Sequence, residues 1–330
     1  MSGEPVIVTG AAGFVGMHVA ERLLDRGETV IGVDVFNDYY DPALKAARAA
    51  RLDGRPGFTM VRMDIADEAA MMALVKSSGA KRIVHLAAQA GVRYSIDNPF
   101  AYQRSNLAGH LSVLEAARHN GVTHLVYASS SSVYGDRPQS LAGGEGAGFR
   151  ETDAVDAPVS LYAATKRANE LMSISYAKLY GFPMSGLRFF TVYGPWGRPD
   201  MAYFGFSQKI FAGQPIEVYG EGRMARDFTY IDDIVDGVVG VLDNPPPPGG
   251  HEIYNIGDND PVGLMDMITT LENAIGREAV KIMRPMQPGD VTATYADISK
   301  LNALTGYRPK VKLKEGLGRF ADWHRTFYPG

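Results

Sequence analysis

TGAAGFVG, residues 9–16, follows a short apolar run and precedes a longer stretch with helical periodicity. Its three glycines, Gly10, Gly13 and Gly16, carry no Cβ atom, so bare backbone can approach a pyrophosphate where a helix begins. A glycine triplet alone is equally compatible with a turn that only packs the helix. The strand before it, the helix after it and an acid at the end of the next strand favour a dinucleotide site.

That acid is Asp34, which ends the next apolar run, TVIGVD. A carboxylate at this position accepts hydrogen bonds from the ribose hydroxyls and repels a 2′-phosphate, so the sequence favours NAD over NADP as the cofactor. Asp64 ends the third apolar run in the same way and is expected near the adenine amino group.

Apolar runs of strand length alternate with helical patterns from the start of the chain to about residue 130, and again at residues 161–189. Strands buried on both faces and separated by helices predict an α/β fold, a Rossmann-type doubly wound parallel sheet. Beyond residue 190 the loops lengthen, which indicates a smaller C-terminal substrate-binding lobe. We expect residues 1–190 to form the cofactor domain and residues 191–330 to form mainly the second lobe, with the chain crossing between the two.

The composition of the 330 residues narrows the classes of function. Hydrophobic residues make up 45% and charged residues 21%, as in globular proteins, and the net charge of −4 gives no general attraction to nucleic acid. The absence of cysteine excludes disulfides and thiolate metal sites, and the 7 histidines are too scattered to predict a metal site. With no apolar stretch of membrane-spanning length and no room for a targeting peptide, we expect a cytoplasmic protein that binds neither membrane nor nucleic acid.

The segment YAATK places Tyr162 and Lys166 four residues apart on a predicted helix, where they share a face. One such pair is also expected by chance in a chain with 17 tyrosines. If the pair is functional, the lysine ammonium and the nicotinamide charge favour the phenolate and lower the tyrosine pKa, which suits a general acid–base group.

Five segments occur along the chain in a fixed order: TGAAGFVG, HLAAQAGVRYS, SSSSVYG, YAATK and RDFTYIDD. This set resembles the extended short-chain dehydrogenase/reductase family, whose members act on nucleotide sugars, over almost the whole chain. The resemblance implies a catalytic triad of Ser130, Tyr162 and Lys166. It also implies a bound NAD whose contacts, besides the three glycines, are Phe14, Val15, Asp34, Asn37, Asp64, Ile65, Leu86, Ala87, Ala88, Gln89, Asn106, Tyr162 and Lys166.

Two further segments, LRFFTVYGPWGRPDMA and GEGRMARDFTYIDDIV, are similar to the UDP-glucuronate 4-epimerase branch of that family. Dehydrating relatives carry Asp and Glu directly after the triad serine, and decarboxylating relatives carry Glu at the second position, whereas this chain has Ser131 and Ser132. UDP-glucose epimerases usually carry Asn where this chain has Thr191. The resemblance implies 4-epimerisation of UDP-glucuronate to UDP-galacturonate through a 4-keto intermediate and transient NADH. Two alternatives remain. The protein is a 4-epimerase or decarboxylase of another UDP-sugar, or it is a non-catalytic NAD-binding scaffold or sensor.

The same resemblance implies a site in which hydroxyls hold the sugar and arginines hold the UDP diphosphate. Arg226 matches the family's diphosphate-binding arginine, and a guanidinium suits bidentate contacts with phosphate. Arg93 either approaches the sugar or the diphosphate, or only holds its loop. We also expect a homodimer formed through residues 99–120 and 161–180. The predicted substrate contacts are Arg93, Ser130, Ser131, Ser132, Thr191, Arg198, Arg226 and Asp290.

Overall fold

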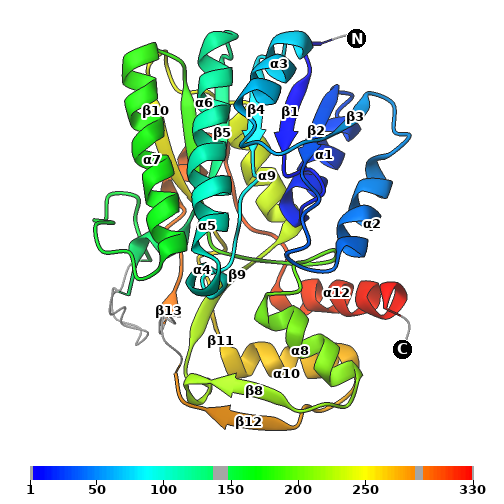
Figure 1. Ribbon diagram of the computed structural model, residues 1–330. Helices are drawn as coiled ribbons and strands as arrows, with labels where there is room; N and C mark the ends of the chain where they lie inside the picture. The colour runs from blue at the N-terminus through cyan, green and yellow to red at the C-terminus, as the bar shows by residue number, and fades with distance from the viewer. Residues whose placement is uncertain (1–2, 137–147, 287–292, 329–330) are drawn as a thin grey trace.

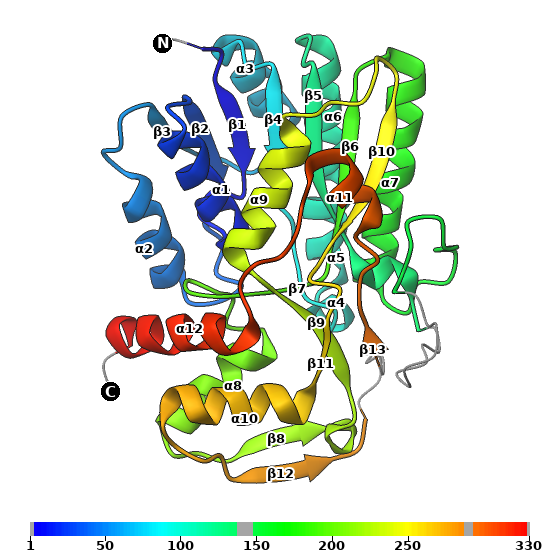
Figure 2. The ribbon, with the colours of Figure 1, turned by 180° about the vertical axis from the view of Figure 1, so that it is seen from behind.

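The computed structural model describes residues 3–136, 148–286 and 293–328. Within these residues seven parallel strands form the main sheet in the order β10-β6-β5-β4-β1-β2-β3, and helices cover both of its faces (Figure 1 and Figure 2). This arrangement confirms the predicted Rossmann-type α/β fold. The strands are β1 (Val6–Thr9), β2 (Val30–Asp34), β3 (Phe58–Arg62), β4 (Arg82–His85), β5 (His124–Ser130), β6 (Met184–Phe189) and β10 (His251–Ile256).

The helices form one layer on each face of the main sheet, with α3, α6 and α7 on one side and α1, α2, α9 and α11 on the other (Figure 1 and Figure 2). The helix expected at residues 99–120 is interrupted by a π-helical turn at Gln103–Ala108. None of the described helices is long and apolar enough to cross a bilayer. The bounds are α1 (Phe14–Asp25), α2 (Pro42–Leu52), α3 (Glu68–Ser78), α4 (Tyr94–Asp97), α5 (Pro99–Tyr102), α6 (Gly109–His119), α7 (Leu161–Tyr180), α9 (Ile231–Leu242) and α11 (Ser299–Thr305).

The strand order reverses at β1, which has β2 on one side and β4 on the other. At such a reversal the loops that follow the two strands diverge and open a crevice at their carboxyl ends. The glycine loop follows β1, and residues 86–89 follow β4. The two loops touch, because a Cβ atom placed on Gly10 would lie 2.8 Å from the backbone nitrogen of Ala87. Two segments predicted to bind NAD therefore meet at this crevice.

A smaller lobe lies beyond the carboxyl ends of the main sheet (Figure 1). In its described part, β9 pairs with β7, β11 and β13, and β8 pairs with β12. The chain returns from this lobe to the main sheet more than once, because α9, β10 and α11 all pack with the larger domain (Figure 2). The lobe elements are β7 (Thr191–Tyr193), α8 (Ala202–Phe211), β8 (Ile216–Tyr219), β9 (Ala225–Tyr230), β11 (Pro261–Gly263), α10 (Leu264–Ile275), β12 (Lys281–Arg284), β13 (Ala293–Thr294) and α12 (Leu313–Phe327).

Candidate active site

A cavity of about 800 Å³ opens between the carboxyl ends of the main sheet and the smaller lobe. Of the site residues predicted from the sequence, Asp290 lies outside the described residues and Asn106 does not line the cavity. The remaining ones all line it: Gly10, Gly13, Phe14, Val15, Gly16, Asp34, Asn37, Asp64, Ile65, Leu86, Ala87, Ala88, Gln89, Arg93, Ser130, Ser131, Ser132, Tyr162, Lys166, Thr191, Arg198 and Arg226.

The glycine loop has the shape and the open donors that a pyrophosphate requires. Gly10 has a φ of 74°, in the left-handed region that favours glycine. Gly13 stands at the N-terminal cap of α1, where no side chain in the described part of the chain caps the helix. The first backbone N–H groups and the positive end of the helix dipole are therefore available to an anion. The loop fits the NAD expected from the sequence.

Asp34, at the end of β2, lies in the part of the cavity predicted to hold the adenosine of the cofactor. Its carboxylate accepts hydrogen bonds from the backbone nitrogens of Ala12, at 3.0 Å, and Phe36, at 2.9 Å. These bonds fix the carboxylate beside the glycine loop, where it is placed to accept the ribose hydroxyls. Next to it, the Asn37 side-chain oxygen accepts a hydrogen bond from the ammonium of Lys45.

Asn106, which was predicted to contact the cofactor, has a supporting role in the protein itself. It lies in the π-helical turn and is buried. Its side-chain oxygen accepts from the Gln89 nitrogen at 2.8 Å, and its side-chain nitrogen donates to the Gln89 carbonyl and to the Thr165 hydroxyl, both at 3.0 Å. Asn106 therefore holds the backbone of the loop after β4 and links it to the helix that carries Tyr162.

Tyr162 and Lys166 lie on the first two turns of α7 and face the cavity together. The ammonium of Lys166 donates to the carbonyl of Ala128, on β5, at 2.8 Å. Burial lowers the pKa of Lys166 to about 8, and the positive charge of Arg198 contributes. Burial raises the pKa of Tyr162, while a hydrogen bond with Ser130 and the charge of Arg198 act in the opposite direction. The lowered tyrosine pKa expected from the sequence is therefore not produced by the protein's own groups, because burial outweighs them.

The serine and threonine hydroxyls at the ends of β5 and β7 have two different roles. Ser130 caps the following turn, here called the serine turn (Ser131–Tyr134): its hydroxyl oxygen accepts from the nitrogen of Ser132 at 3.2 Å and from the Ser132 hydroxyl at 2.9 Å. Ser131 and Thr191 line the cavity, and their hydroxyls have no hydrogen-bond partner among the described residues. These two neutral groups are available to a ligand.

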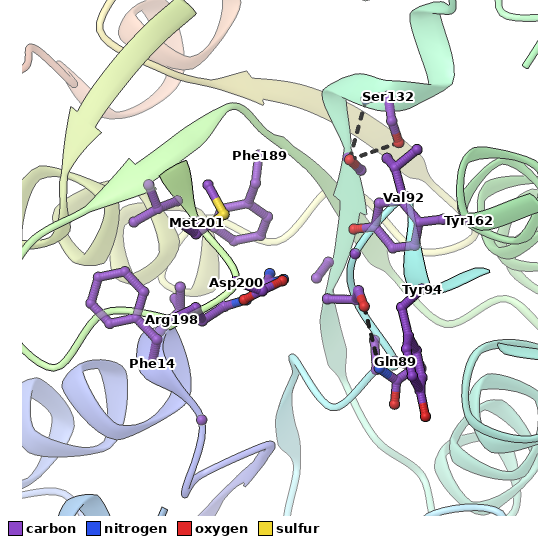
Figure 3. Close-up of a pocket in the computed structure, with 18 of the residues that line it drawn as sticks. Phe14, Gln89, Val92, Tyr94, Ser132, Tyr162, Phe189, Arg198, Asp200 and Met201 are labelled. Carbon is purple, nitrogen blue, oxygen red and sulfur yellow. Dashed lines mark hydrogen bonds and ion pairs between the residues drawn. The ribbon is translucent and has the colours of Figure 1, made fainter. Parts of the chain in front are cut away.

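An ion pair that the sequence analysis missed faces Tyr162 across the cavity (Figure 3). Arg198 contacts Asp200 through its Nε atom at 3.0 Å and through a second guanidinium nitrogen. The hydroxyl of Tyr39 donates to the same carboxylate at 3.0 Å, and the Tyr39 ring lies 4.6 Å from that of Tyr94. The charge of Asp200 raises the pKa of Arg198, although burial acts against it. Asp200 lies only two residues after Arg198, so this partner was within reach of a sequence argument, whereas Tyr39 and Tyr94 come from distant parts of the chain.

The other two predicted arginines lie where the lobe meets the main domain. Arg93 places its guanidinium 5.4 Å from the ring centre of Tyr219, on β8, and so reaches from one domain to the other. Arg226 is the second residue of β9, and its guanidinium donates to the carbonyl of Ala225, the first residue, at 2.8 Å. Both line the cavity.

Known proteins resemble the chain in both sequence and structure. The model of the NAD dependent epimerase/dehydratase family matches residues 6–257. The probable UDP-glucuronate 4-epimerase of Rhizobium meliloti is 46% identical over an alignment of 338 positions that covers 98% of this chain and 97% of that protein. UDP-glucuronate 4-epimerase 3 of Arabidopsis thaliana is 45% identical over an alignment of 343 positions that covers 99% of this chain and 78% of that protein. The solved structure of UDP-glucuronic acid 4-epimerase from Bacillus cereus, in complex with UDP-glucuronic acid and NAD, has a TM-score of 0.90 and 34% identity, and the match covers 98% of this chain and 100% of that one. The chain therefore belongs to the NAD dependent epimerase/dehydratase family.

Proposed function

We propose that this protein is an NAD-dependent 4-epimerase that interconverts UDP-glucuronate and UDP-galacturonate. One observation carries the proposal: the cavity that holds Tyr162 and Lys166 is also lined by Ser131, directly after β5, and Thr191, at the start of β7, whose neutral hydroxyls have no partner within residues 3–136, 148–286 and 293–328. Neutral hydroxyls donate hydrogen bonds to a sugar carboxylate, whereas an acidic side chain at the same place would repel it. The curated and solved relatives described above support the same substrate.

The proposed chemistry is a closed cycle of proton and hydride transfer at C4 of the sugar. When bound, NAD supplies the acceptor for the C4 hydride and later the donor that returns it. Tyr162 takes the proton of the C4 hydroxyl and gives it back to the 4-keto intermediate after the sugar has turned over, with Ser130 as its hydrogen-bonding partner. Lys166, held by Ala128, keeps a positive charge near the phenol. The net redox change is zero, so the cofactor need not leave.

The hydroxyls are proposed to prevent a side reaction. A 4-keto hexuronate is a β-keto acid, and it loses CO₂ when the bond to its carboxyl carbon lies perpendicular to the plane of the ketone. Ser131, Ser132 and Thr191 would fix the carboxylate in another orientation. Ser132 already donates to Ser130, so Ser131 and Thr191 are the more available pair. Arg226 and Arg198 would hold the diphosphate.

The decisive experiment incubates purified protein with a panel of UDP-sugars and no added NAD, and identifies the products by NMR. We expect UDP-galacturonate from UDP-glucuronate, and NAD in the purified protein. A product from UDP-glucose alone would contradict the substrate assignment, and UDP-pentose as the main product would indicate a decarboxylase. Failure to turn over any sugar would favour an NAD-binding scaffold.

We also propose that the protein works as a cytoplasmic homodimer. Phe100, Leu171 and Leu179 are apolar side chains on α5 and α7, and each is more than half exposed. Exposed apolar groups on neighbouring helices suit an isologous interface between two copies. Light scattering should give twice the mass of one chain; a monomer would refute this part of the proposal.

A further inference from the structure

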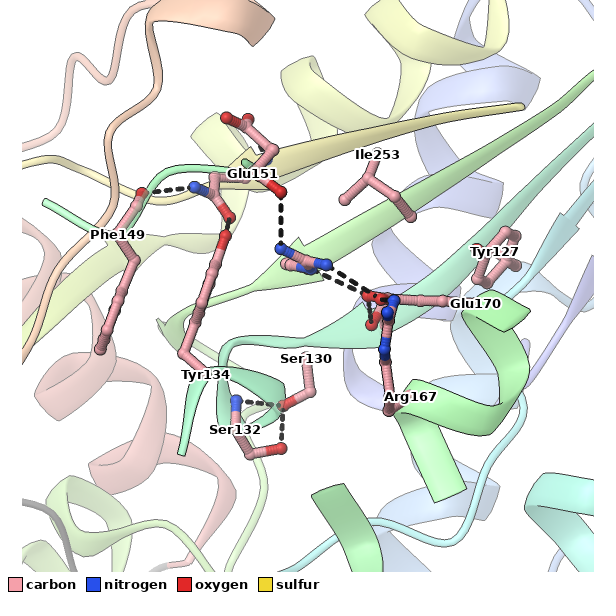
Figure 4. Close-up of polar contacts among 12 residues, drawn as sticks. Tyr127, Ser130, Ser132, Tyr134, Phe149, Glu151, Arg167, Glu170 and Ile253 are labelled. Carbon is pink, nitrogen blue, oxygen red and sulfur yellow. Dashed lines mark hydrogen bonds and ion pairs between the residues drawn. The ribbon is translucent and has the colours of Figure 1, made fainter. Parts of the chain in front are cut away.

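A buried carboxylate lies one helical turn beyond Lys166 and takes no part in the chemistry proposed above. Glu170, on α7, is fully buried, and its carboxylate is bound from three directions (Figure 4). Arg188, on β6, binds both of its oxygens, through Nε at 2.8 Å and through Nη2 at 2.9 Å. Ser129, on β5, donates its hydroxyl at 2.6 Å, and Arg167 donates at 3.0 Å. The pair of Glu170 and Arg188 therefore joins α7 to two strands of the main sheet.

The same guanidinium also contacts the serine turn. Arg188 lies 4.8 Å from the ring centre of Tyr134, the last residue of that turn. The Tyr134 hydroxyl donates to the side-chain oxygen of Asn255, on β10, at 2.6 Å, and its ring stacks on Phe149 at 4.4 Å (Figure 4). Arg188 is thus packed between the helix that carries Tyr162 and Lys166 and the turn that carries the substrate hydroxyls.

Consecutive residues of β5 connect this pair to the catalytic groups. Ala128 accepts the hydrogen bond of Lys166, Ser129 donates to Glu170, and Ser130 is the triad serine. Lys166 and Glu170 are four residues apart on α7, so two successive turns of the helix are bonded to two successive residues of the strand. Loss of the second bond would allow α7 to shift along β5.

We propose that Glu170 and Arg188 are positioning residues that hold Lys166 and the serine turn in the geometry required for hydride and proton transfer. This inference rests on the proposed function, because it concerns the same site. Neither side chain lines the cavity, so both act through the groups that they hold.

The charge of Glu170 also acts on the pKa of Lys166, which packing of the Glu170–Arg188 pair alone would not do. Burial and the charge of Arg198 lower the pKa of Lys166, and the charge of Glu170 raises it. Glu170 stays ionised, since its contacts with Arg188, Ser129 and Arg167 outweigh burial and hold its pKa below the usual value. Three neutral titratable groups of the described chain also lie near Lys166: Tyr162, whose pKa burial raises, and His85, on β4, and His110, on α6, whose pKa values burial lowers. Glu170 is therefore the negative charge that opposes loss of the Lys166 proton, beside the hydrogen bond to the Ala128 carbonyl.

The test uses the NAD-loaded protein and two variants, Glu170→Gln and Glu170→Gln combined with Arg188→Met. The single variant leaves Arg188 without its partner in the interior, whereas removing both charges of a buried pair often leaves stability unchanged. For both variants we expect kcat to fall by about 10²-fold, the size of a small misplacement of catalytic groups, with a smaller change in KM. The basic limb of the kcat–pH profile should move to lower pH, because Lys166 then loses its proton more easily.

Glu115→Gln is the matched control. Glu115 forms a similar bidentate pair with Arg118, at 2.7 and 2.8 Å, on α6 and away from the cavity. Its kcat and pH profile should equal those of the unmodified protein. NMR titration of isotope-labelled lysine measures the pKa of Lys166 without any substrate, and it should fall when Glu170 is replaced.

The inference is overturned if the double variant melts at the temperature of the unmodified protein and keeps its kcat, its pH profile and its Lys166 titration. The kinetic comparison is made with whichever UDP-sugar the unmodified protein turns over. Failure of UDP-glucuronate as a substrate would therefore refute the proposed function and leave this test intact.

Discussion

Removal of the two available hydroxyls, by Ser131→Ala together with Thr191→Ala, is expected to weaken UDP-glucuronate binding and release CO₂ from the intermediate. Both hydroxyls line the cavity without a partner among the described residues, so each is free to donate to the carboxylate. A hydrogen bond to a charged group is worth about 1.5–3 kcal/mol, so the pair contributes about 3–6 kcal/mol. The dissociation constant should rise by roughly 10²- to 10⁴-fold, and each single variant should show about half of that on a logarithmic scale.

Calorimetric titration of the NAD-loaded protein measures the affinity, and NMR of the reaction mixture detects UDP-pentose beside the epimer. Ser207→Ala is a suitable control, because this buried hydroxyl donates to the Tyr203 carbonyl at 2.7 Å and does not line the cavity. Unchanged affinity in the double variant, with no decarboxylated product, would show that the carboxylate is held elsewhere. Arg198 and Arg93 would then be the next groups to replace.

Three further outcomes are expected. Tyr162→Phe should lower kcat by about 10²- to 10⁴-fold with UDP-sugar affinity preserved, since it removes one hydroxyl and keeps the ring; activity within a few-fold of normal would make Tyr162 a packing residue. Asp34→Ala should raise the dissociation constant for NAD by roughly 10- to 100-fold, and unchanged NAD content after gel filtration would contradict this. The melting temperature should fall below about pH 6.5. Histidines with lowered pKa values take up protons only when the protein unfolds, so the folded state loses stability as the pH falls. A melting temperature that stays constant across this pH range would contradict the prediction. These histidines are the buried His85, His110, His124 and His324 and the partly buried His18 and His251.

The fold was predictable because its signals are local. The alternation of buried strands with helices indicates a parallel sheet, and the glycine loop lies between the first strand and the first helix, as the structure has them. Tyr162 and Lys166 were predicted on one helix face, and both line the cavity. Each of these features depends on residues close together in the chain.

The features that the sequence did not predict depend on distant partners or on burial. Asp200 binds Tyr39, 161 residues away, and no spacing rule links the two. The hydrogen bonds of Asn106 with the backbone of Gln89 were not predicted either, because no side-chain pattern encodes a backbone partner. The pKa of Tyr162 depends on how deeply the ring is buried, and a one-dimensional pattern does not contain that quantity.

The route of the chain between the two domains has a consequence for dissecting or recombining the protein. All six residues of β6 pair with β10, which the chain adds only after it has built the first part of the smaller lobe. A fragment that stops at residue 190 would keep the glycine loop and the triad, yet it would leave β6 as an unpaired edge strand open to intermolecular pairing. Exchange of one contiguous gene segment with a homologue would therefore split the main sheet, and specificity is better transplanted residue by residue than by grafting a domain.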